Sequence, residues 1–170
     1  MPDSVNAQGL LGGAAVGVAA TVTMDVAMVA AAKLAANAFA SEKNSPEAIG
    51  RWAAGLCRGR WRSQDMSAET PVRGELWLGL AAHYLTGVVL TEVYLTAVRR
   101  GGRRPGVAGA TAYGIATAVL PLLLMYPSMG YGCCGRRSGD ARRLVGSMLL
   151  GHAAFGAGIG LWAAATRRTG

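Results

Sequence analysis

Four long runs of apolar residues, separated by stretches rich in arginine, dominate the pattern of this chain. The runs cover residues 10–32, 76–98, 107–126 and 144–165. Each is about 20 residues long or slightly longer, and at about 1.5 Å per residue a helix of that length crosses a hydrocarbon core about 30 Å thick. The pattern predicts an all-α integral membrane bundle of four transmembrane helices, with both chain ends on the same side of the membrane.

The one long connection, residues 41–75, predicts a shorter helix of its own at 46–57. Ser45 is a favourable N-cap residue, Pro46 suits the first turn, and Glu47 suits the positive end of the helix dipole. Apolar side chains recur on one face of this segment, so we expect a short interfacial helix that lies on the membrane surface. The side chains expected at the interface are those of Arg51, Trp52, Arg58 and Arg60.

Composition agrees with a single membrane domain over residues 1–170. The chain is 52% hydrophobic, has 25 glycines and carries a formal net charge of +8. The arginines directly flank the apolar runs, where membrane proteins place them to meet lipid headgroups, so we expect the lipid bilayer and no nucleic acid as the partner. Pairs of glycines four residues apart in the first and last runs predict close helix packing.

Ionisable residues inside the apolar runs are the candidate functional groups. Asp25, His83 and His152 each lie seven or eight residues from the same side of the membrane, which corresponds to a common depth of roughly 10 to 12 Å. We therefore expect these three side chains to meet in an intramembrane polar site. Candidate neighbours of that site are Thr21, Tyr84 and Tyr126. Glu92 falls on the opposite helix face from His83, so we expect it to be structural and bonded to a neighbouring helix or arginine.

Three interpretations of this polar set remain open. The side chains of Asp25, His83 and His152 form a hydrogen-bonded knot that fixes helix register, or a relay for protons or a cation, or a ligand set for a metal ion or haem. Neither HExxH nor CxxC spacing occurs in the chain, so no metal is assigned, and any metal would use these three residues. No cofactor follows from the sequence.

Short motifs in a fixed order resemble a known family. They are Met24 and Asp25 in the first run, Gly50 to Trp52 and Arg58 to Arg60 in the long connection, His83 and Tyr84 in the second run, and His152 with Phe155 and Gly156 in the fourth. Together they resemble the bacterial membrane proteins catalogued as domain of unknown function 2938, from about Gly12 to Ala165. Tyr126 departs from that pattern, which has glutamine before the proline.

The resemblance implies a small multi-pass protein of the bacterial cytoplasmic (inner) membrane, with no established activity to carry over. It also implies that Asp25, His83 and His152 stand at positions around which the family pattern is built. Our leading hypothesis is a membrane protein that handles protons, a cation or a small polar solute at these residues. The alternatives are a membrane-embedded metal- or haem-binding redox enzyme and a structural accessory subunit. Because four spans enclose little volume, a homo-oligomer or a membrane partner protein is compatible with each hypothesis.

Overall fold

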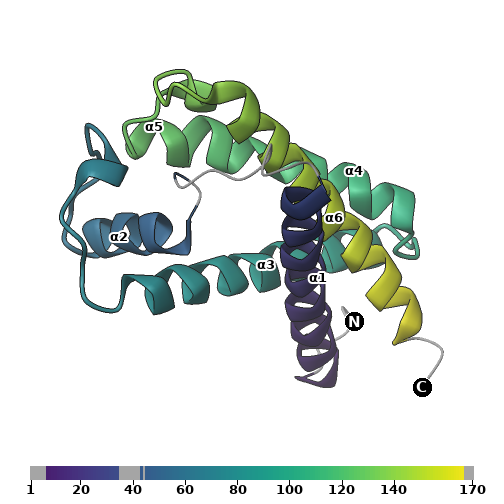
Figure 1. Ribbon diagram of the computed structural model, residues 1–170. Helices are drawn as coiled ribbons and strands as arrows, with labels where there is room; N and C mark the ends of the chain where they lie inside the picture. The colour runs from purple at the N-terminus through teal and green to yellow at the C-terminus, as the bar shows by residue number, and fades with distance from the viewer. Residues whose placement is uncertain (1–6, 35–42, 44, 167–170) are drawn as a thin grey trace.

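The computed structural model describes residues 7–34, 43 and 45–166, and in this part of the chain the regular secondary structure is entirely helical. In chain order the main helices are α1 (Ala7–Leu34), α2 (Pro46–Cys57), α3 (Glu75–Arg100), α4 (Val107–Thr117) and α6 (Ala141–Ala165) (Figure 1). By length and composition, four helical segments in the described residues are able to cross a membrane: Leu11–Leu34, Glu75–Arg100, Val107–Ser128 and Ala141–Ala165. The prediction of an all-α fold with four apolar helices and a short helix between the first two is confirmed.

The third apolar segment is interrupted near its end. After α4 the chain passes through a π-helical turn, η3 (Pro121–Met125), into the single turn α5 (Tyr126–Ser128). Pro121 has no N–H to donate, and the N–H of Tyr126 bonds to the Pro121 carbonyl five residues earlier, which widens the helix locally. The single helix predicted at 107–126 is therefore a composite.

Helix α6 packs against both α1 and α4, and α1 also packs against α3 (Figure 1). Small residues allow these close approaches: a Cβ on Gly17 of α1 would lie 2.7 Å from Cα of Val88, and a Cβ on Gly160 of α6 would lie 2.5 Å from Cα of Val107. The glycine pairs therefore act as close-packing sites, as predicted. The apolar core between these helices consists of Val16, Ala20, Tyr94, Leu95, Ala110, Phe155, Ile159 and Ala163.

Helix α2 lies beside the first turns of α3 (Figure 1). Its predicted cap is present, because Ser45 Oγ accepts a hydrogen bond from the N–H of Ala48 at 3.2 Å. Gly50 and Gly79 face each other with no side chains between, so the two backbones touch. Helix α2 also contributes Ala48 to a second core, which it forms with the 3₁₀ turn η2 (Met66–Ala68), the end of the third apolar segment, the turn after it and the start of α6. The buried members of this core are Ala48, Met66, Ala118, Leu122, Tyr126, Met129, Tyr131 and Leu144.

Two of the four side chains expected at the interface form hydrogen bonds to neighbouring elements. Arg51 is only 8% exposed and forms two hydrogen bonds to the carboxylate of Glu75, at 2.9 and 2.8 Å. Trp52 donates from Nε1 to Ser128 Oγ at 2.8 Å. The planar guanidinium fork matches a carboxylate, and this pairing draws Arg51 toward α3 rather than toward headgroups. Arg58 and Arg60 are exposed.

Candidate intramembrane polar site

The centre of the candidate site is a carboxylate of α1 held by two consecutive residues of α3. Nε2 of His83 lies 3.0 Å from Oδ1 of Asp25, and the hydroxyl of Tyr84 donates to Oδ2 at 2.8 Å. Successive residues of a helix point about 100° apart, yet both side chains reach the Asp25 carboxylate. Each carboxylate oxygen of Asp25 therefore has one partner from α3.

This group is accessible from outside the helix bundle. The side chain of Asp25 is 42% exposed and that of His83 is 27% exposed. A charged side chain surrounded by hydrocarbon is costly, and in membrane proteins such groups face water-filled cavities or polar partners. The Asp25 and His83 pair is thus partly exposed, unlike a polar contact sealed within a core.

His152 is held separately, by α4. Its Nδ1 lies 2.9 Å from Oγ1 of Thr117, and the Thr117 hydroxyl is 2.6 Å from the carbonyl oxygen of Gly114. A hydroxyl has one proton to donate, so with that proton on the Gly114 carbonyl the Thr117 oxygen accepts from Nδ1–H of a neutral imidazole. This arrangement leaves Nε2 of His152 as the nitrogen with a free lone pair.

The structure therefore joins Asp25 to His83 and Tyr84, while His152 donates its hydrogen bond to Thr117 of α4. The imidazoles of His83 and His152 are still near enough to interact electrostatically. In the residues that the structure describes, no three histidine, cysteine, aspartate or glutamate side chains are grouped so that they hold a metal ion. Asp25, His83 and His152 therefore do not meet in one cluster, although the sequence places them at a similar depth, because α6 directs His152 toward α4.

The predicted neighbours fall in three different places. Tyr84 contacts Asp25 directly. Thr21 instead donates to the carbonyl oxygen of Gly17 at 2.9 Å and packs over Gly87 of α3. Tyr126 is fully buried in the second core, where its ring centroid lies 6.1 Å from that of Tyr131. Its side chain therefore belongs to that core.

Glu92 also differs from the expectation. Its carboxylate packs against Gly13 of α1, and Oε1 is buried without a hydrogen-bond partner among the described residues. The neighbouring Thr91 Oγ1 is buried and likewise unpaired within that part of the chain. The expected bond from Glu92 to another helix or to an arginine is not formed there.

Thr117 is the contact residue that the sequence interpretation missed. A single threonine in an apolar helix carries no recognisable signal, and its role arises only where α4 crosses α6. The crossing is close because Gly114 and Gly156 face each other across it. Sequence spacing within one helix does not encode such a pairing.

The fold and this site define a helical protein with four apolar segments long enough to cross a membrane and an ionisable group between the first two. The chain belongs to the family described as Protein of unknown function (DUF2938), whose sequence profile matches residues 14–167. The resemblance seen in the sequence motifs is confirmed. No curated protein and no solved structure matches the chain.

Proposed function

We propose that this chain is a multi-pass protein of the bacterial cytoplasmic membrane that handles protons, a cation or a small polar solute at Asp25 and His83, with His152 as a second imidazole nearby. The observation that carries this proposal is the bonded Asp25, His83 and Tyr84 group, which lies within apolar helices and is partly exposed. Intramembrane ionisable groups of this kind are typical of ion and proton pathways.

The geometry supports proton exchange at His83. Its Nε2 is held by Asp25, so Nδ1 is the nitrogen left for proton exchange. Tyr84 holds the second carboxylate oxygen and keeps the carboxylate in place. His152, fixed through Nδ1 by Thr117, presents Nε2 as the next acceptor. Each imidazole is thus anchored by one nitrogen and reactive at the other.

Two features favour this function over the alternatives. A purely structural polar knot is most stabilising when it is buried and fully bonded, whereas the Asp25 side chain is 42% exposed. A metal- or haem-binding enzyme needs ligands that converge, whereas the hydrogen bonds of His83 and His152 run to different helices.

The experiment is a flux measurement on purified protein in proteoliposomes that contain the pH dye pyranine, with a potassium diffusion potential as driving force. We expect Asp25→Asn and His83→Ala to lower proton flux by about tenfold or more, and His152→Ala to lower it less, because removal of a proton-transfer group typically costs at least that much. Glu92→Gln is the matched control, since it also removes an intramembrane carboxylate, and we expect it to retain most of the flux. Repeating the assay with potassium or sodium gradients distinguishes protons from a cation.

Equal losses in Glu92→Gln and His83→Ala would contradict the proposed site. A wild-type protein without flux, whose Asp25→Asn variant melts at a lower temperature, would favour the structural accessory subunit. Elemental analysis and an ultraviolet-visible spectrum of the same samples test the redox enzyme, because a stoichiometric metal or haem lost in both histidine variants would establish a ligand site.

A further inference from the structure

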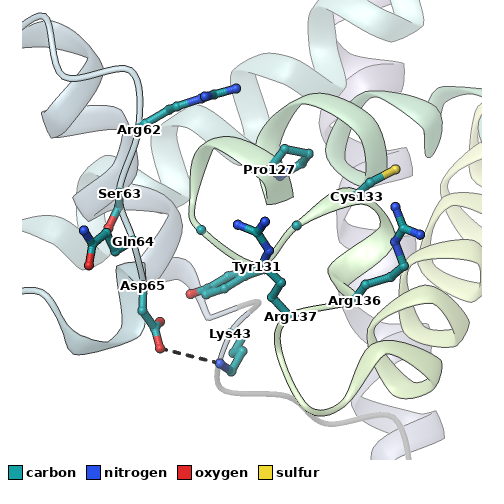
Figure 2. Close-up of a pocket in the computed structure, with 12 residues that line it drawn as sticks. Lys43, Arg62, Ser63, Gln64, Asp65, Pro127, Tyr131, Cys133, Arg136 and Arg137 are labelled. Atoms are coloured by element: carbon teal, nitrogen blue, oxygen red, sulfur yellow. Dashed lines mark ion pairs between the residues drawn. The ribbon is translucent and has the colours of Figure 1, made fainter.

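A basic pocket lies at the end of the third apolar helix, and Asp25, His83 and Tyr84 are not among its lining residues. It has a volume of about 920 Å³ and opens between the loop before η2 and the turn that follows α5 (Figure 2). This volume is within the range of sites for small molecules. Its lining residues are Lys43, Arg62, Ser63, Gln64, Asp65, Pro127, Gly130, Tyr131, Gly132, Cys133, Arg136 and Arg137.

Backbone hydrogen bonds fix the two walls of this pocket to each other. The N–H of Ser63 donates to the carbonyl oxygen of Ser128 at 2.8 Å, and the N–H of Met66 donates to the carbonyl oxygen of Met129 at 2.9 Å. Gly130, with φ of +91°, lies directly against the carbonyl of Gln64, where a side chain would not fit. The pocket is therefore a built feature of the fold rather than a gap between independent loops.

The charge in the pocket is strongly one-sided. Four cationic side chains and one carboxylate line it, which gives a formal charge of +3. Nζ of Lys43 lies 3.9 Å from Oδ2 of Asp65 and above the ring of Tyr131, so this ammonium group already has partners. Within the described part of the chain Arg62, Arg136 and Arg137 form no ion pair, and all three are exposed.

The three unpaired arginines come from opposite walls. Figure 2 shows Arg62 extending from the loop on one side, and Arg136 and Arg137 rising from the turn on the other. The like charges of these arginines repel one another, and an anion bound between them would offset this repulsion. Guanidinium forks bind phosphate oxygens in a bidentate manner, which makes phosphate the anion that this set fits best.

The pocket also occupies the position expected of a headgroup site. Pro127 belongs to the last turn of the third apolar helix, and α6 begins shortly after Arg137. Arginines immediately beyond apolar spans lie at the level of lipid phosphates. We propose that this pocket binds a phosphate-bearing anion, which is either the headgroup of an acidic lipid or a small soluble phosphate ester. This proposal does not depend on the function assigned to Asp25 and His83.

The test is a binding measurement on the full-length protein in a neutral detergent. The probes are short-chain phosphatidylglycerol, phosphatidylcholine of the same chain length, and glycerol 1-phosphate. The pocket variant is the triple substitution Arg62→Gln, Arg136→Gln and Arg137→Gln. The matched control removes the same charge from the last turn of α3 and the loop that follows it, through Arg99→Gln, Arg103→Gln and Arg104→Gln. Circular dichroism and gel filtration check that both variants fold.

We expect phosphatidylglycerol to bind at least about tenfold more weakly to the pocket variant than to wild type, because charge-assisted hydrogen bonds are stronger than neutral ones. Its affinity for the control variant should differ from wild type by about twofold or less. Binding of the lipid without glycerol 1-phosphate supports a headgroup site. Binding of glycerol 1-phosphate with the same dependence on the three arginines supports a soluble phosphate ester. No binding of either phosphate probe, or equal weakening in both triple variants, would overturn the proposal.

Discussion

The imidazole of His83 and the carboxylate of Asp25 connect α3 to α1, with Nε2 of the ring 3.0 Å from Oδ1 of the acid. Tyr84 completes this contact by donating to the other oxygen at 2.8 Å. The same two helices also approach closely at Gly17 and Gly87. The first two spans therefore meet through both the polar contact and the glycine contacts.

Removal of the Tyr84 hydroxyl tests this polar contact. We expect Tyr84→Phe to lower the apparent free energy of unfolding by about 1 to 2 kcal/mol, because a hydrogen bond to a charged group contributes somewhat more than a neutral one. The measurement is unfolding by sodium dodecyl sulfate in mixed micelles. Tyr94→Phe is the control, since the Tyr94 hydroxyl has no hydrogen bond among the described residues. Equal destabilisation by the two substitutions would contradict a specific role for the Tyr84 hydroxyl.

Thr117 is expected to act as a positioning residue for His152. If the proposed proton pathway is correct, Thr117→Val should lower proton flux by about the same factor as His152→Ala and alter its pH profile, because the ring loses the acceptor that fixes its orientation. Thr117→Ser keeps that acceptor and should restore both readouts. Failure of serine to restore the wild-type pH profile would show that the threonine only packs.

Much of this fold is predictable from the sequence, because each span and its flanking arginines are local patterns. The cap of α2 at Ser45 is local as well. The hydrogen bond between Asp25 and His83 follows from their common depth on neighbouring helices. The partner of His152 does not follow in this way, because it depends on the direction in which α6 crosses α4. The partner of Arg51 is likewise not predictable from local sequence, because Glu75 lies 24 residues further along the chain and on another helix.

Removal of one partner from the ion pair between Arg51 and Glu75 should strongly weaken the α2 and α3 contact. Both side chains are nearly buried, at 10% and 12% exposed, and the hydrogen bonds that Arg51 donates to the Glu75 carboxylate raise the pKa of Arg51. We expect Glu75→Gln to lower the free energy of unfolding by about 3 kcal/mol, since it leaves a buried charge without its partner.

Two further variants make the ion-pair measurement specific. Arg51→Met combined with Glu75→Met should recover part of the lost stability, because it removes both charges together. Arg60→Gln breaks the exposed pair with Glu69, at 3.4 Å, and should cost less than about 1 kcal/mol. A cost for Glu75→Gln no larger than that for Arg60→Gln would show that burial does not strengthen the pair.

The crossing of α4 and α6 predicts a sharp difference between two glycines. A Cβ on Gly114 would overlap the carbonyl oxygen of His152, and it would lie 2.8 Å from Cα of Gly156. We expect Gly114→Ala to lower the unfolding free energy by about 2 kcal/mol or more, since overpacking forces the helices apart. Gly12→Ala is the control, because nothing lies within 4 Å of its Cβ position, and there alanine should be neutral or stabilising by up to about 1 kcal/mol. Similar melting temperatures for the two variants would contradict the close crossing.

Tyr131 predicts a loss of stability at alkaline pH. Its side chain is 1% exposed, and burial raises the pKa of its hydroxyl to about 12, against about 10 in an unfolded chain. The folded protein therefore holds the hydroxyl proton of Tyr131 more tightly than the unfolded chain does. The stability from this difference is fully present below about pH 10 and is lost as the pH rises toward 12; it amounts to at most about 3 kcal/mol. Tyr131→Phe should flatten this part of the unfolding profile between pH 9 and pH 12 relative to wild type, whereas identical slopes would show that the folded hydroxyl ionises as easily as the unfolded one.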